Sequence, residues 1–155
     1  MQNTRVLIAA AGKGSRSRLN YPKTLYKIDN TPILIKILKT FSEFDNIPTI
    51  IVSPSGEEII DKTIKKYGFS ADLIIQKKPT GMGDAILCYQ KSEAYNKTDN
   101  ILLIWGDVPF IKKKTLRILT KSHLKNKNHF TFLSGFSKKA YTVVKRNHFF
   151  IIGNF

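Results

Sequence analysis

Apolar residues gather in four short runs, which are separated by amphipathic stretches. The runs are residues 5–9, 49–53, 73–76 and 101–105. None alternates strictly between apolar and polar positions, a pattern typical of strands that are buried on both faces of a parallel sheet. Trp105, at the end of the fourth run, is accordingly predicted to be a core residue.

The stretches between the runs have the spacing of amphipathic helices. The first is predicted to begin with Thr31 as N-cap and Pro32 at the first helical position. The second covers residues 57–67, the third follows Gly83, and the fourth includes residues 116–123. The residues predicted to face the core are Leu34, Ile37, Leu38, Phe41, Phe44, Ile59, Ile60, Ile64, Ala85, Ile86, Tyr89, Leu116, Leu119 and His123.

Alternating strands and helices predict an α/β fold: a Rossmann-like, doubly wound, mostly parallel sheet with flanking helices. Residues 141–145 and 149–152 flank a polar turn and predict a C-terminal β-hairpin. No linker-like segment divides the chain, so residues 1–155 are predicted to form a single domain.

Ligands of such sheets bind outside the carboxyl ends of the strands, where the first loop is rich in glycine. Gly12 and Gly14 let backbone N–H groups approach an anion, and Lys13, Arg16 and Lys23 supply positive charge. These features predict a site for a polyphosphate. A solvated turn is the competing interpretation.

Two common phosphate motifs do not fit this loop. A P-loop requires four residues between its first glycine and a Gly-Lys-Ser/Thr ending, whereas Gly14 follows Lys13 directly. A dinucleotide-binding loop requires a third glycine or alanine at position 17, where this chain has Ser17.

Asp107 follows the fourth run and Gly106, so its carboxylate is predicted to project at the same edge of the sheet. Taken alone, such an aspartate is more often a helix cap or a turn residue. Beside a cationic glycine loop it becomes a candidate Mg²⁺ ligand, because Mg²⁺ commonly joins one or two carboxylates to substrate phosphates.

Composition narrows the partners. The chain has 26 Lys and Arg against 11 Asp and Glu, and no acidic residue follows Asp107. This basic third allows a nucleic-acid or membrane-surface partner, but solvated lysine-rich faces explain it more simply. No apolar run is long enough to cross a bilayer and no signal peptide is evident, so we expect a cytoplasmic protein. The single cysteine, Cys88, is expected to be a reduced core residue.

Three motifs together resemble the nucleotidyltransferase family that makes nucleotide sugars. They are IAAAGKGSR followed by Pro22-Lys23, QKKPTGMGDA from residue 76, and ILLIWGDVPFI from residue 101. Their joint occurrence in this order is far more specific than any one of them. The N-acetylglucosamine-1-phosphate uridylyltransferase domain is the most similar, and cytidylyltransferases share the first motif.

The resemblance implies transfer of a nucleoside monophosphate from UTP or CTP to a sugar-1-phosphate, with Mg²⁺ as cofactor and release of pyrophosphate. It implies that Arg16 and Lys23 are catalytic and that Asp107 is the metal ligand. The implied nucleotide-binding residues are Ala10, Ala11, Gly12, Lys13, Gly14, Gln76, Gly81, Met82 and Gly106.

The chain also departs from the family pattern. Met82 stands where members of the family usually have a hydroxyl residue, which bears on recognition of the base. Thr142 stands where they have a glycine, which bears on recognition of the sugar. Members normally extend well past the length of this chain, so the resemblance implies a C-terminally truncated version. Residues 1–111 would be its NTP-binding half, and residues 112–155 a partial acceptor half. The apolar tail could pair with another protomer to form an oligomer. A nucleotide-binding module without turnover, and a cytidylyltransferase acting on a non-sugar alcohol phosphate, are the alternative functions.

Overall fold

A computed structural model describes residues 3–12, 19–78 and 81–135. The chain divides into two compact units, residues 1–113 and 114–155. The first unit contains the predicted α/β fold. The second contains most of helix α4 (Lys113–Lys125), in which Leu116 is buried. The predicted C-terminal hairpin lies outside the described residues.

The four predicted strands are confirmed within a residue at each end. They are β1 (Thr4–Ala9), β4 (Thr49–Val52), β5 (Asp72–Ile75) and β6 (Asn100–Trp105). All are parallel, and the sheet order is β5-β4-β1-β6. In chain order this is third, second, first, fourth, so the direction of winding reverses between β1 and β6.

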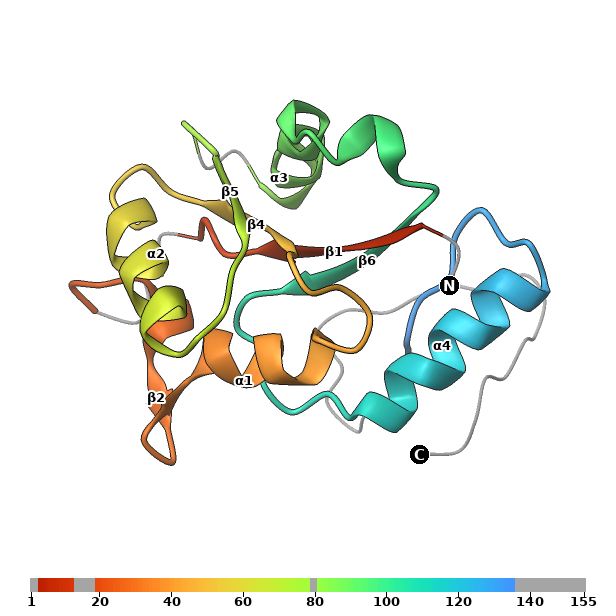
Figure 1. Cartoon of the computed structure of the whole chain (residues 1–155), viewed down its shortest axis with the longest axis horizontal. Coiled ribbons are helices and arrows are strands. Elements are labelled where there is room, and N and C mark those ends of the chain that lie inside the picture. The colour runs from red at the N-terminus through yellow and green to blue at the C-terminus, as the bar shows by residue number, and fades with distance from the viewer. Residues whose placement is uncertain (1–2, 13–18, 79–80, 136–155) are drawn as a thin grey trace. The chain divides into compact units, whose positions relative to one another are not determined.

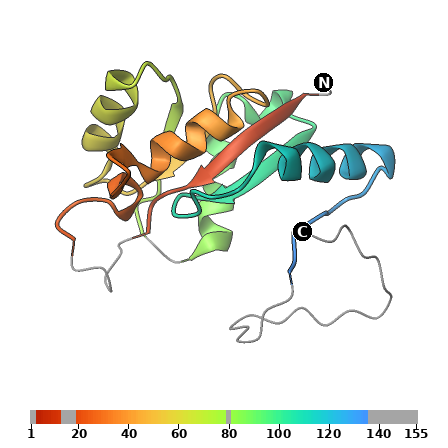
Figure 2. The ribbon, with the colours of Figure 1, turned by 90° about the horizontal axis from the view of Figure 1, so that it is seen from below.

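Helices cover both faces of the sheet, as the doubly wound prediction requires. Helices α1 (Ile33–Phe41) and α2 (Glu57–Lys66) lie on one face, and α3 (Met82–Cys88) lies on the other (Figure 1). Figure 2 shows the same elements from below, with α2 at the left. The short 3-10 helices η1 (Lys23–Leu25), η2 (Tyr89–Lys91) and η3 (Tyr95–Lys97) occupy connections.

The core on the α3 side is built from side chains of the sheet and of α3. Leu7 and Ile51 pack with Ala85, Cys88 and Tyr89 there, and all five are at least 94% buried. The prediction that Cys88 is a core residue is thus confirmed. On the other face, the buried side chains of the two helices are Ile33, Leu34, Ile35, Ile37, Leu38, Phe41, Ile60 and Ile64.

Strand β6 corrects the prediction that every strand is buried on both faces. Leu102 and Ile104 are buried, whereas Ile101, Leu103 and Trp105 are 44%, 39% and 58% exposed. Strand β6 lies at an edge of the sheet, and α3 packs over the more central β1 on that face. A continuous apolar run therefore does not distinguish a two-sided strand from an edge strand with one face uncovered. The prediction that Trp105 is a core residue is wrong.

The beginning of the first helix also differs from the prediction. Thr31–Pro32 forms strand β3, which pairs with β2 (Lys27–Ile28) in an antiparallel hairpin. Asp29 and Asn30 make its turn with φ of 51° and 60°, the positive values that a tight hairpin turn requires. Pro32 precedes α1 as its N-cap instead of opening it. In α2, Ile59 is 42% exposed, so its predicted burial is wrong too.

Candidate functional site

The carboxyl ends of β1 and β6 meet where the winding of the sheet reverses. The Gly106 N–H donates to the Ala9 carbonyl oxygen at 2.8 Å, which continues the pairing of the two strands past their ends. An added Cβ at Gly106 would lie 3.0 Å from the Ala10 Cβ and 3.1 Å from the Ala9 oxygen. Glycine is required there because the first loop passes directly against the end of β6.

The segment after the first loop is anchored to the same point. The Thr24 hydroxyl donates to the Gly106 carbonyl oxygen at 2.8 Å in a buried contact. Its neighbour Lys23 forms an ion pair with Asp107, with 2.8 Å between Nζ and Oδ2. Residues 84 positions apart in the sequence are thus joined at one edge of the sheet.

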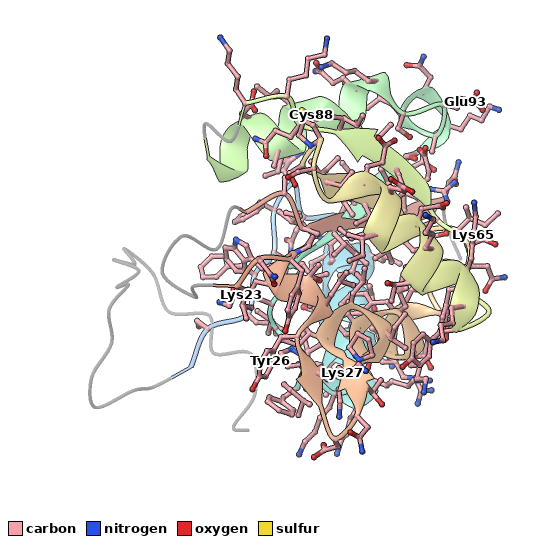
Figure 3. All side chains as sticks on the ribbon, turned by 90° about the vertical axis from the view of Figure 1, so that its left-hand side faces the viewer. Lys23, Tyr26, Lys27, Lys65, Cys88 and Glu93 are labelled. Carbon is pink, nitrogen blue, oxygen red and sulfur yellow. The ribbon has the colours of Figure 1, made fainter. Side chains whose placement is uncertain are left out.

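Lys23 and Asp107 remain accessible to water, since their side chains are 49% and 43% exposed. In Figure 3, Lys23 lies between Tyr26 and Lys27 below it and Cys88 above it. An exposed ion pair contributes only about 0–1 kcal/mol to stability, so both groups can take other partners at little cost.

The loop after β4 reaches this edge as well. An added Cβ at Gly56 would lie 2.9 Å from the Ser53 hydroxyl oxygen and 3.0 Å from the Pro22 Cγ. The Gly56 backbone therefore packs tightly beside Pro22, directly before Lys23. The sequence analysis gave no role to Gly56 or Thr24, because no motif marks either contact.

A second polar cluster lies at the carboxyl end of β5. Gln76 is 4% exposed, and its backbone N–H donates to the Val52 carbonyl oxygen at 2.8 Å. Its side-chain Nε2 lies 2.6 Å from Asp84 Oδ2 and 3.3 Å from the Gly81 carbonyl oxygen. Gly81 has φ of 123°, a conformation that residues with a Cβ rarely adopt.

The structure describes part of the predicted site. Ala10 and Ala11 are buried and Gly12 is exposed, with open space around the position of an added Cβ at Gly12. Met82 begins α3, and its side chain is outside the described part. Lys13, Gly14 and Arg16 also lie outside the described residues.

The parallel sheet, its winding reversal and the polar groups at that edge define a Rossmann-like domain of the kind that binds nucleotides. The chain belongs to the family of MobA-like NTP transferase domains, which matches residues 6–148. The resemblance to nucleotidyltransferases is thereby confirmed.

Known proteins agree with this assignment. "Bifunctional protein GlmU" of Thermosipho melanesiensis is 31% identical over 130 residues, which cover 84% of this chain and 27% of that protein. The chain thus spans about a quarter of the length of this relative.

Two solved structures share the fold. The 4-diphosphocytidyl-2C-methyl-D-erythritol synthase of Anaerococcus prevotii superposes with a TM-score of 0.64 at 17% identity, covering 80% of this chain and 52% of that one. A CMP:2-keto-3-deoxy-manno-octonic acid synthetase complexed with CTP gives 0.62 at 17% identity, covering 81% and 49%.

Proposed function

We propose that this domain transfers a nucleoside monophosphate from UTP or CTP to a sugar-1-phosphate and releases pyrophosphate. The observation that carries the proposal is the ion pair between Lys23 and Asp107 beside the first loop, at the reversal point of the sheet. A lysine for phosphate charge and a carboxylate for a divalent cation are the two groups that a metal-bound triphosphate needs together.

The triphosphate would lie along the first loop. Its backbone N–H groups would face the phosphates, and Lys23 would neutralise charge as pyrophosphate leaves. Gly106 supports this arrangement because it lets the loop pass close to the end of β6. The residues assigned to phosphate binding are Ala10, Ala11, Gly12, Lys13, Gly14, Arg16 and Lys23.

The base would bind at the other cluster, against Gln76 and the Gly81–Met82 segment. An acceptor phosphate oxygen then attacks the α-phosphorus. A new P–O bond forms, the bond between the α-phosphorus and the bridging oxygen breaks, and that oxygen leaves with pyrophosphate. No covalent intermediate with the protein is needed, so positioning and charge stabilisation account for the chemistry.

Asp107 fits a Mg²⁺ ion that is held jointly by protein and nucleotide. Among the described residues, no group of three or more His, Cys, Asp or Glu side chains could hold a metal. A single accessible carboxylate suits Mg²⁺, which usually keeps several waters and binds substrate phosphates. When bound, the ion would add positive charge on the phosphates.

The test is Mg²⁺-dependent pyrophosphate release, measured for the four common NTPs against a panel of sugar-1-phosphates and non-sugar alcohol phosphates. We expect release with a pyrimidine nucleotide and at least one sugar-1-phosphate. If pyrophosphate is released only with an alcohol phosphate, the acceptor is an alcohol phosphate and not a sugar-1-phosphate. The name of the Anaerococcus prevotii synthase of similar fold motivates this part of the panel. Calorimetric binding of NTP without release for any pair would support the nucleotide-binding module instead.

A further inference from the structure

The side-chain amide of Gln76 has a fixed orientation. In a buried amide, oxygen and nitrogen are distinguished by their partners. Both partners of Nε2, the Gly81 carbonyl oxygen and Asp84 Oδ2, are oxygens that accept hydrogen bonds. Turning the amide over would place Oε1 against them with no hydrogen between. The NH₂ group must therefore face Gly81 and Asp84.

This orientation uses both hydrogens of the Gln76 amide. One hydrogen serves the Gly81 carbonyl oxygen, 3.3 Å from Nε2, and the other serves Asp84 Oδ2, 2.6 Å from Nε2. No described residue donates a hydrogen bond to Oε1 in return. Gln76 can thus offer a ligand only its oxygen, as a hydrogen-bond acceptor.

The hydrogen bond to Asp84 contributes more to this orientation than the one to Gly81. The Asp84 contact with Nε2 is the shorter of the two, and a carboxylate acceptor makes a stronger hydrogen bond than a neutral carbonyl. Gln76 is almost fully buried, so water cannot easily replace a lost partner. Without Asp84, the weaker contact to Gly81 would compete with the turned-over amide.

We propose that Asp84 is a positioning residue that presents Gln76 as an acceptor, so that the site takes a nucleotide whose base directs an N–H group at Gln76 Oε1. This inference rests on the proposed function for the identity of the ligand. The N3–H of uracil and the exocyclic amine of cytosine both supply such a donor. A base that turned only a carbonyl oxygen toward Gln76 would be rejected, since two acceptors would then face each other.

The orientation is tested first, without any nucleotide. In the ¹⁵N-labelled full chain, the Gln76 NH₂ signals are assigned by their loss in Gln76→Met. We expect one proton shifted downfield and both in slow exchange with water. In Asp84→Ala the shift and the protection should be lost, and Asp84→Asn, which keeps an oxygen acceptor, should be intermediate. Glu93→Ala removes an exposed carboxylate from the same region and should change neither signal.

An ordinary shift and fast exchange of the Gln76 amide in the unsubstituted chain would overturn the proposal. Far-ultraviolet circular dichroism of each variant distinguishes this result from unfolding. If Asp84→Ala does not fold, Asp84→Asn decides the test by itself. If the Gln76 amide turns over in Asp84→Asn, its NH₂ group no longer faces position 84 and the downfield signal disappears.

The second measurement is calorimetric affinity for UTP, CTP, GTP, ATP and N3-methyl-UTP, with inorganic triphosphate as reference. We expect Asp84→Ala to weaken binding of the preferred nucleotide on the order of tenfold. The ratio between the affinities for the most and the least preferred nucleotide should become smaller, while the affinity for inorganic triphosphate stays the same. Loss of N3-methyl-UTP binding in the unsubstituted chain would identify N3–H as the donor, and preference for CTP would identify the amine.

The outcomes separate this inference from the function on which it rests. If Asp84→Ala weakens all nucleotides equally, Asp84 is merely structural and the inference fails while the proposed function stands. If the unsubstituted chain binds no nucleotide, the proposed function fails, and with it the identity of the ligand. The amide signals then still decide whether Asp84 sets the orientation of Gln76.

Discussion

The two polar clusters of the candidate site hold their groups in opposite ways. Lys23 and Asp107, at the ends of β1 and β6, are both more than 40% exposed. Gln76, at the end of β5, is 4% exposed and is held by two acceptors. The exposed pair can exchange one partner for another because water solvates each charge during the exchange. The buried amide cannot, since an unpaired polar group away from water is costly.

This difference suits the two halves of a nucleotide. Phosphates and a divalent cation enter as charges and leave rearranged as pyrophosphate, so their ligands must be replaceable. A base is recognised by a fixed pattern of donors and acceptors, so its partner should have only one orientation. The predictions that follow test whether the two clusters divide the work in this way.

The largest effect is expected from Asp107→Asn. Removing the charge should lower the Mg²⁺-dependent pyrophosphate release by about a hundredfold or more, because the proposed Mg²⁺ ion loses the one protein carboxylate assigned to it. Affinity for free NTP without Mg²⁺ should not fall, because Asp107 repels phosphate. The control is Asp61→Asn, which removes a partly exposed carboxylate paired with Lys65 on α2. Equal loss in both variants would contradict the role of Asp107.

The close packing at Gly106 is tested by alanine. In Gly106→Ala the added Cβ would lie 3.0–3.2 Å from Ala9 and Ala10, two of the three contacts being with backbone atoms, so the first loop must shift. We expect the free energy of unfolding in urea to fall by about 1–3 kcal/mol, and the KM for NTP to rise.

Gly12→Ala is the matched variant, since an added Cβ at Gly12 meets nothing within 4 Å. Its stability should change by less than about 0.5 kcal/mol. A raised KM for NTP at unchanged stability would indicate that phosphate approaches this backbone. If Gly106→Ala is as stable as Gly12→Ala, the packing of the loop against β6 is looser than the distances indicate.

Local patterns predicted the fold well and the site only in part. The strands and the doubly wound sheet follow from runs such as residues 49–53, in which the strand Thr49–Val52 is buried throughout. The exposed face of β6 and of Trp105 could not be predicted, because what covers a strand is decided by distant segments. Asp107 and Gln76 carry recognisable chemistry. Thr24 does not, since a threonine that donates to a carbonyl 82 residues away has no sequence signature.

Replacing the lysine tests whether the exposed pair really exchanges partners. Lys23→Met leaves Asp107 without its ammonium partner. In the absence of nucleotide, we expect Mn²⁺ to bind a few-fold more tightly, as measured by electron paramagnetic resonance, because Nζ no longer competes for the carboxylate. Affinity for NTP should fall, because a phosphate-neutralising charge is lost. Weaker Mn²⁺ binding in Lys23→Met would show that the Lys23 ammonium and the metal ion do not compete for Asp107.

The smallest effect is expected from an exposed pair far from this chemistry. Lys62 donates to Glu58 one turn away on α2, and this hydrogen bond, with the charge of Lys62, lowers the pKa of Glu58. A carboxyl whose pKa is lowered by folding contributes stability above its unfolded value, and the contribution is lost as pH falls through the folded value. Lys62→Met should therefore cost little stability at neutral pH and progressively less below pH 4.5. Urea unfolding at several pH values measures this loss of stability. Lys62→Met also serves as a control for Lys23→Met, because it removes the same charge. Unchanged binding of Mn²⁺ and NTP in Lys62→Met would show that the effects of Lys23→Met arise from the place of Lys23 beside Asp107.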